Sequence, residues 1–433
     1  MSLARRLGLA SLLCNSLACS DSGASDDEIG SDTSDPGPDP AQPFGSHAFA
    51  YAPGSVLPSR PADELDAATR AFYDVWKARY LKAGCGSGRY YVAANTEPGN
   101  LTVSEAHGYG MLIAAIMAGH DPDAKIIFDG FYRYFRDHPS AASPDLMAWY
   151  QASSCADDQG QDSASDGDLD IAFALLLADK QWGSCAGIDY RGAALEVIAA
   201  IGDHELDESH GYVLLGDWAT ADDPDGYHDA TRSSDLLGDH FHSFALASGD
   251  PAWTDLRDST YTLIAALQTN AAPNTGLLPD FIVSPLVAPM PAPADFLEDV
   301  SDGSYAYNAC RDPWRIATDF LVSGDPRAQA AALAMTNWIA ESTSGDPNQI
   351  RAGYQLDGSP SPDSDYLTMA FVAPFGPAAM VSDGHQAWLD AIWQTTLEAE
   401  PEGYYEDTLK LLTMIVMSGN WWAPEAAADV CSP

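Results

Sequence analysis

The feature of this sequence that most constrains its fold is a run of about twelve segments in which apolar residues recur at positions i, i+3, i+4 and i+7. Turn-forming residues separate these segments; Gly249-Asp250-Pro251, for example, ends one segment and opens the next. Strand signals are few and short. The chain also lacks the repeat of fixed period expected of an open α-solenoid, so short turns between the segments favour an all-α ring of six helical hairpins. The spacing predicts helices over residues 62–82, 105–119, 124–137, 167–181, 189–203, 233–248, 253–269, 309–322, 326–342, 367–381, 384–398 and 405–418.

The composition is that of a folded and strongly acidic protein. Of the 433 residues, 46% are hydrophobic and 10% are aromatic, well above the content of disordered chains. Lys and Arg number 20 against 63 Asp and Glu, which gives a formal net charge of −43 at pH 7. This charge repels phosphate polyanions and anionic membranes, which argues strongly against nucleic acid as a partner. The same field favours a neutral or cationic polymer, although an acidic balance is also a general means of solubility.

The N-terminal segment predicts an exported protein. Residues 1–19 carry two Arg, then an apolar stretch too short to cross a bilayer, then small residues, the pattern of a secretory signal peptide. The Ala18-Cys19 end resembles a bacterial lipoprotein cleavage box, so a lipid anchor on Cys19 and plain secretion both remain open. Residues 20–45 are acidic and rich in Ser, Gly and Pro, which predicts a flexible linker, and residues 46–433 are expected to form one catalytic domain.

Five cysteines remain after the N-terminal segment, and an oxidising compartment favours disulfides among them. Because five is odd, at least one is unpaired unless Cys19 takes part, and we expect it to be Cys310, which lies in a helical pattern. The five are Cys85, Cys155, Cys185, Cys310 and Cys431.

Two helix starts carry unusual carboxylates. Thr102-Val103-Ser104-Glu105 precedes an apolar run, and taken alone it is typical of a capping box in which Thr102 is the cap. The stretch from Ser163 to Asp170 holds three Asp residues at alternate positions, beginning with Asp166. Taken alone, these acids are equally typical of side chains that interact favourably with a helix N-terminus.

Both segments resemble the hallmark motifs of glycoside hydrolase family 8. Residues 102–111 are similar to the family's Val-Ser-Glu-Gly-x-Gly-Tyr-Gly motif, whose Glu is the general acid, with His107 where many members have another residue. Residues 164–182 fit every position of the second motif, whose first Asp contacts the sugar beside the scissile bond. The resemblance covers residues 62–422 and implies an (α/α)6 barrel with a substrate cleft at one end. It also implies Glu105 as the general acid and Asp166 as a residue that positions the sugar.

The chemistry implied by the resemblance is inverting glycoside hydrolysis, in which one protonated carboxyl donates to the leaving oxygen and one carboxylate activates a water. We expect burial and the nearby acid Asp166 to raise the pKa of Glu105. Asn308 stands where the main branch of the family has its base, and an amide cannot take up a proton. Resemblance to a branch typified by bacterial chitosanases, which use a Glu from an inserted loop, implies Glu298 as the general base. The rivals for this role are Asp295, Asp299 and Asp235, and Asp235 is also a candidate for positioning the attacking water.

Aromatic and cationic side chains near these motifs are candidates for substrate binding. Aromatic faces bind the apolar sides of pyranose rings, which favours Trp149, Trp218 and Tyr307, although each is also compatible with core packing. Asn308, directly after Tyr307, and Arg311, four residues after it, join this set. Arg311 and Arg315 lie four residues apart, on one face of a helix, and as scarce cations they are expected to pair with site carboxylates. We expect no metal and no cofactor.

The sequence therefore predicts an exported, monomeric, endo-acting hydrolase of β-1,4-linked polysaccharide. Chitosan is the favoured substrate because of the resemblance around Asn308 and Glu298, and because glucosamine polymers are cationic below neutral pH. The first alternative is an endo-β-1,4-glucanase or lichenase with the same mechanism. An alternative of another class is a surface carbohydrate-binding protein without turnover.

Overall fold

The computed structural model describes residues 38–157 and 159–431. The predicted signal peptide, Cys19 and most of the predicted linker lie outside these residues. No helix within the described ranges is long and apolar enough to cross a membrane.

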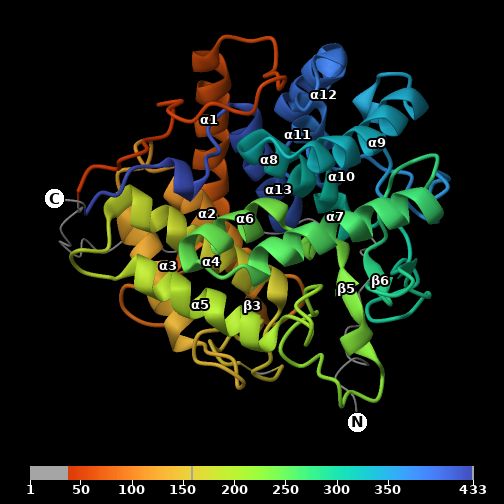
Figure 1. The fold of residues 1–433 in the computed structure, drawn as a ribbon. Coiled ribbons are helices and arrows are strands. Elements are labelled where there is room, and N and C mark those ends of the chain that lie inside the picture. The colour runs from red at the N-terminus through yellow and green to blue at the C-terminus, as the bar shows by residue number, and fades with distance from the viewer. Residues whose placement is uncertain (1–37, 158, 432–433) are drawn as a thin grey trace, which may run out of the picture.

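Helices in two concentric layers form an (α/α)6 barrel (Figure 1). In the inner layer each helix contacts the next and the last returns to the first, so the ring closes. One outer helix packs on each inner helix: α3 on α2, α5 on α4, α7 on α6, α9 on α8, α12 on α11, and α1 on α13. The predicted ring of six hairpins is confirmed. The inner helices are α2 (Ser104–Ile116), α4 (Ser165–Trp182), α6 (Gly238–Ser248), α8 (Asp312–Ser323), α11 (Phe375–Met380) and α13 (Tyr404–Met417). The outer helices are α1 (Ala62–Tyr80), α3 (Ala124–Asp137), α5 (Tyr190–His204), α7 (Ala252–Asn270), α9 (Pro326–Ser342) and α12 (Gln386–Glu398).

Burial separates the two layers. Every residue of α4 except Lys180 is buried, because an inner helix has neighbours on all sides. The outer helix α3 buries an apolar stripe, and its charged residues are partly or fully exposed. An all-round apolar helix belongs in an interior and an amphipathic one at a surface, so the sequence itself assigns the layers.

Three predicted helices are shorter or interrupted. The predicted helix over residues 233–248 begins as a 3-10 turn, Ser233–Asp235, and becomes α6 only at Gly238. The predicted helix over 309–322 begins with a similar turn, Ala309–Arg311, before α8. The predicted helix over 367–381 divides into α10 (Met369–Val372) and α11, because Pro374 has no N–H to continue the hydrogen-bond ladder.

Short antiparallel strands gather at the N-terminal ends of the inner helices. Strand β3 (Asn100–Val103) pairs with β4 (Tyr150–Ala152) and runs directly into α2. Strand β5 (Ala230–Arg232) pairs with β6 (Phe281–Val283), which pairs with β7 (Met290–Pro291). A third ladder joins β1 (Leu81–Ala83) to β2 (Tyr90–Val92). These strands hold the loops that enter α2 and α6, where the candidate site residues begin.

The opposite end of the barrel is closed by the segment of residues 41–56, here called the strap (red in Figure 1). A helix leaves its last carbonyls without intrahelical partners, and a buried end needs donors from elsewhere. The strap supplies them at the C-terminal ends of α2, α4, α8, α11 and α13. The donors are the backbone N–H groups of Ala41, Phe44, Ala52 and Val56 and the hydroxyl of Tyr51, which bond to the carbonyls of Gln181, Ala118, Leu321, Met380 and Val416 respectively.

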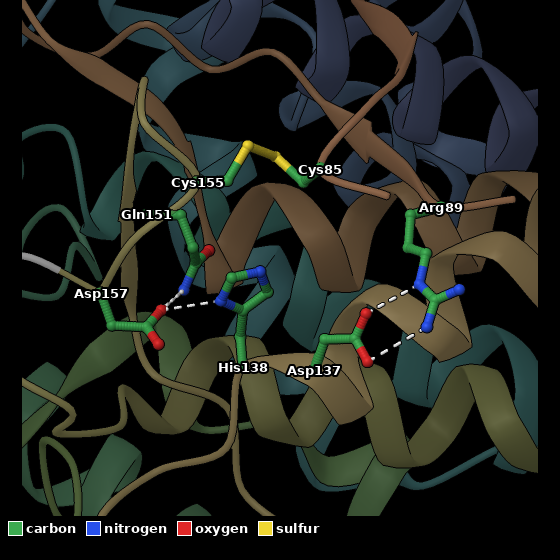
Figure 2. The surroundings of a disulfide bond; sticks show 7 residues. All are labelled: Cys85, Arg89, Asp137, His138, Gln151, Cys155 and Asp157. Carbon is green, nitrogen blue, oxygen red and sulfur yellow. Dashed lines mark hydrogen bonds and ion pairs between the residues drawn. A yellow bond between two sulfur atoms is a disulfide. The ribbon is translucent and has the colours of Figure 1, made fainter. Parts of the chain in front are cut away.

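Two disulfides join distant parts of the chain. Cys85–Cys155 ties the loop before β2 to the turn after β4, and Cys185–Cys431 ties the loop after α4 to the end of the described chain. Figure 2 shows the first disulfide with its two polar neighbours, the Arg89–Asp137 ion pair and the Asp157 carboxylate bonded to Gln151 and His138. Cys310 is buried and unpaired, so the expectation that it is the free cysteine is confirmed.

The strap predicts a measurable contribution to stability. A chain beginning at residue 57 loses four backbone hydrogen bonds to helix ends, each worth about 1 kcal/mol. We expect urea unfolding, followed by circular dichroism, to give an unfolding free energy about 3 kcal/mol or more below that of a chain beginning at residue 38. Equal urea midpoints for the two chains would show that the strap covers the barrel end without stabilising it.

Candidate active site

The predicted catalytic residues converge at the N-terminal ends of the inner helices. Glu105 is the second residue of α2 and Asp166 the second of α4, while Arg311 directly precedes α8. Tyr404 is the first residue of α13. Because all inner helices point the same way, residues far apart in sequence meet at this one end.

Two glycines of the motifs allow the close contact between α2 and α4. A Cβ added to Gly108 would lie 2.7 Å from the Cβ of Asp170, and one added to Gly167 would lie 2.5 Å from the hydroxyl of Ser104. Only a residue without a side chain fits at such distances. These glycines therefore let the two helices approach until Glu105 and Asp166 share a partner.

That partner is Arg311, whose side chain is 1% exposed. Its Nη1 donates to Glu105 Oε2 at 2.9 Å and to Asp166 Oδ2 at 3.0 Å. Its Nη2 donates to Asn308 Oδ1 at 2.9 Å. The expectation that Arg311 pairs with site carboxylates is confirmed. Arg315 instead binds Asp170, a fully buried acid of α4, through both terminal nitrogens.

The two carboxyls on Arg311 have opposite pKa shifts. Burial raises the pKa of Glu105 to about 7, against the lowering effect of Arg311 and of the Tyr404 hydroxyl, which donates to Glu105 Oε1 at 3.0 Å. Burial alone would also raise the pKa of Asp166, but Arg232 and Arg311 together outweigh it and hold that pKa below its ordinary value. At neutral pH the site therefore combines a carboxyl able to donate a proton with a stable carboxylate.

The capping-box interpretation of residues 102–105 is wrong. Thr102 lies within β3 and its side chain caps no helix N–H, and Val103 occupies the cap position. Glu105 points to Arg311 and Tyr404 rather than back to its own helix end. The side chain of Glu105 therefore makes tertiary contacts and does not cap its own helix.

Glu298 lies at the same site, on the other side of Asn308. The Asn308 amide donates from Nδ2 to Glu298 Oε2 at 3.0 Å, while its own oxygen accepts from Arg311. Burial raises the pKa of Glu298, and Arg232 and Asn308 counter part of this rise. The Asp302 carboxylate accepts the backbone N–H groups of Leu297, Glu298 and Asp299, which fixes the turn that carries Glu298.

The structure separates the rivals for the base. Asp295 is exposed, and Asp299 is engaged with the backbone and hydroxyl of Ser301. Asp235 is fully buried and bonded to Arg232, so its carboxylate fixes that cation. Of the candidate bases, Glu298 is the acid joined by hydrogen bonds through Asn308 to Arg311.

Arg232 is a site residue that the sequence analysis missed. Its guanidinium lies between Asp166, at 3.6 Å, and Asp235, at 3.3 Å, and its charge also acts on Glu298. The sequence offered one clue to Arg232. The chain has only 20 Lys and Arg residues, and this one stands three positions before the candidate acid Asp235. Its contact with Asp166 joins residues 66 positions apart, which no local pattern reveals.

The three predicted aromatic residues differ in their neighbours and in their exposure. Trp149 is partly buried, and its carbonyl accepts the N–H of Ser104, the residue before Glu105. Trp218 is partly buried and packs edge-on against Tyr227. Tyr307 is 37% exposed and its hydroxyl is hydrogen-bonded to that of Tyr366. All three are partly or largely accessible, and their binding of substrate stays a prediction.

Comparison with known proteins identifies relatives over almost the whole barrel. The profile of the family described as Glycosyl hydrolases family 8 matches residues 62–419. A β-glucanase of Niallia circulans is 47% identical, over 88% of this chain and 92% of its own length. An endoglucanase of Bacillus sp. strain KSM-330 is 37% identical, over 86% of this chain and 80% of its own length. The apo structure of a β-1,3-1,4-glucanase from Paenibacillus sp. X4 superposes with a TM-score of 0.85 at 46% identity, and covers 89% of this chain and 100% of that one.

The contact between Asn308 and Glu298 predicts a pKa change. Asn308→Ala removes a donor to the Glu298 carboxylate, and a hydrogen bond to a charged group is worth about 1.5 kcal/mol, so the pKa of Glu298 should rise by about one unit. Carboxyl NMR of carbon-labelled Glu, with the Glu298 signal assigned through Glu298→Gln, measures it. Asn337→Ala, on the exposed face of α9, is the control and should leave this signal in place. A fall in the pKa of Glu298 would contradict the assigned hydrogen bond.

Proposed function

Because the chain belongs to glycosyl hydrolase family 8, we propose that it hydrolyses β-glucan at internal linkages, by a single displacement that inverts the anomeric carbon. The observation that carries the proposal is the hydrogen-bonded series Glu105–Arg311–Asn308–Glu298. Inverting hydrolysis needs one proton donor and one base, with room for a water between them. In this site the side chains of Arg311 and Asn308 hold the carboxyls of Glu105 and Glu298 apart.

In the proposed reaction Glu105 gives its proton to the glycosidic oxygen as the bond from that oxygen to the anomeric carbon breaks. Glu298 takes a proton from a water, whose oxygen forms the new bond to the anomeric carbon from the opposite face. Arg311 and Tyr404 already point at Glu105, so they stabilise the carboxylate that forms when the proton leaves. Asp166, kept ionised by two Arg side chains, is suited to accept hydrogen bonds from sugar hydroxyls.

The two carboxyls set opposite limits on pH. Glu105 must hold its proton, so activity falls as pH rises through about 7. Glu298 must be ionised, so activity also falls as pH drops through its pKa, which burial places above the usual range. The proposed reaction therefore has a bell-shaped profile with its maximum on the acidic side of neutrality.

The relatives favour β-glucan as the substrate. Two similar proteins are a β-glucanase and a β-1,3-1,4-glucanase, at 47% and 46% identity, and a third is an endoglucanase. We therefore place mixed-linkage β-glucan first and cellulose derivatives second. Chitosan, favoured by the sequence analysis for the resemblance around Asn308 and Glu298, remains a candidate, and the net charge of −43, which attracts a cationic polymer, also supports it.

A substrate panel with active-site variants tests this function. A chain that begins at residue 38, and so contains both the strap and the barrel, is assayed for reducing-sugar release on lichenan, carboxymethyl cellulose and chitosan. We expect lichenan to be cut fastest, and Glu105→Gln and Glu298→Gln to lower kcat by about 10²- to 10⁴-fold, the usual contribution of general acid–base catalysis. The first product seen by proton NMR should be the α-anomer.

Asp295→Asn and Asp299→Asn, in the same loop as Glu298, are the matched controls and should retain activity. A β-anomer as the first product would exclude inversion. Activity that survives Glu298→Gln but not Asp299→Asn would move the base to Asp299. Sugar binding without product from the unaltered chain would favour the carbohydrate-binding alternative, and fastest release from chitosan would reverse the order of substrates.

We further propose that the protein is exported and works as a monomer outside the cytoplasm, released or held by a lipid on Cys19. The two disulfides support export, because such bonds persist in oxidising compartments. Fractionation of cells expressing the full chain, with mass spectrometry of its N-terminus, should find it outside the cytoplasm and cleaved before Cys19 or Ser20. An uncleaved cytoplasmic protein would exclude export.

A further inference from the structure

A second group of carboxyls lies beneath the site and takes no part in the proposed reaction. Asp168, on α4, and Glu205, directly after α5, are both fully buried. Asp168 Oδ1 accepts the backbone N–H of Met147 at 2.9 Å, and Glu205 Oε1 accepts the hydroxyl of Ser163 at 2.5 Å. The other two oxygens, Asp168 Oδ2 and Glu205 Oε2, have no donor, and the two carboxyls are in hydrogen-bonding contact.

Two ionised carboxylates are not stable in this arrangement. Each would lose its hydration, and each would face the other as a like charge. The neighbouring titratable groups add to the repulsion, because Asp217, from the loop after Glu205, and Asp235, from the turn before α6, are also acids. One proton between the pair removes one charge and gives both unpartnered oxygens a hydrogen bond. Consistent with this, burial raises the pKa of Glu205 to about 8 and that of Asp168 well above its ordinary value.

The pair also connects the loops that carry two predicted sugar-binding residues. Met147, bonded to Asp168, lies two residues before Trp149. Ser163, bonded to Glu205, is tied to Asp217 by two further hydrogen bonds, from its backbone N–H to Asp217 Oδ1 at 2.9 Å and from the Asp217 N–H to its hydroxyl at 3.0 Å. Asp217 directly precedes Trp218. The two loops and the start of α4 thus meet at this carboxyl contact, which adds to the hydrogen bond from the Trp149 N–H to the Asp162 carbonyl.

We propose that Asp168 and Glu205 share one proton, and that this carboxyl–carboxylate hydrogen bond positions the loops of Trp149 and Trp218 beside Asp166. The pair acts on the reaction only through these loops, and its residues are positioning residues. The effect on catalysis rests on the proposed function, whereas the shared proton and its effect on stability do not.

The shared proton makes stability depend on pH with a defined sign. An ordinary Glu or Asp in the unfolded chain loses its proton near pH 4, while the folded pair keeps one proton up to about pH 8. Between these values the folded state holds more protons than the unfolded state, so the free energy of unfolding falls as pH rises, and the fall ends once the folded pair has lost its proton. Loss of the proton should also loosen the two loops.

Glu205→Gln is the decisive variant, because its amide supplies an N–H to Asp168 Oδ2 without any titrating proton and keeps an oxygen for Ser163. We expect its melting temperature at pH 9 to exceed that of the unaltered chain by about 3 °C or more, with little difference at pH 5. An infrared difference spectrum at pH 7 should show one protonated carboxyl fewer than in the unaltered chain. Glu196→Gln, on the exposed face of α5, is the matched control and should change neither measurement.

Kinetic measurements on the Glu205 variants test whether the pair positions the two loops. On the best glucan substrate, Glu205→Gln should keep kcat/KM at pH 6 within about twofold and should show a smaller rise of KM towards pH 9, because the loops stay fixed. Glu205→Ala lacks any donor to Asp168 and should raise KM at every pH. A melting temperature of Glu205→Gln that falls with pH as steeply as that of the unaltered chain, together with an unchanged carboxyl spectrum, would overturn the shared proton. If no chain hydrolyses glucan, the melting and infrared measurements still decide it, and only the proposed function fails.

Discussion

The ion pairs of Arg311 are the interaction on which the rest of the site depends. A guanidinium that is 1% exposed is stable only when its charge and its donors are matched, and Glu105, Asp166 and Asn308 match them. One cation does not fully compensate two carboxylates. Asp166 also has an ion pair with Arg232, whereas Glu105 contacts the neutral hydroxyl of Tyr404, and burial outweighs the lowering effect of both Arg side chains on the pKa of Glu105. The less compensated acid keeps its proton, and this asymmetry divides the two carboxyls into a donor and a permanent anion.

The direction of the inner helices explains why the two ends of the barrel differ. N-terminal ends present free N–H groups and a partial positive charge, which favour carboxylates, and Glu105 and Asp166 both lie within the first turn of their helices. C-terminal ends present free carbonyls, which need donors, and the strap provides them from one continuous segment. The chemistry at one end and the closure at the other are thus two consequences of the same parallel arrangement.

Sequence could predict what depends on local spacing. The helical periods predicted the ring of six hairpins and most of the helix limits, and the two motifs singled out Glu105 and Asp166, which the structure brings onto one guanidinium. The break at Pro374 was missed because the apolar spacing continues across it while the hydrogen-bond ladder does not. Arg232, Asp302 and the Asp168–Glu205 pair were also missed as functional groups, because their meaning lies in contacts between segments distant in sequence or in the hydrogen bonds of a folded turn. Asp235 was considered as a base or a water-positioning residue, and only the fold shows it buried beneath Arg232.

Asn308 shows how a departure from a family motif can belong to a different arrangement of the same chemistry. An Asp at this position would place a carboxylate 3.0 Å from Glu298 and within reach of Arg311, which already binds two carboxylates. Such crowding would raise the pKa of every acid around the guanidinium and leave Glu298 protonated near neutral pH. The amide removes that charge and does two things that a carboxylate cannot do at once: its oxygen accepts from Arg311, and its N–H donates to Glu298. Because the Arg311 contact fixes which end of the amide faces which neighbour, Asn308 necessarily presents a donor to Glu298 and favours its ionised form. Asn308, which at first suggests the loss of a base, therefore favours the ionised form that the proposed base Glu298 requires.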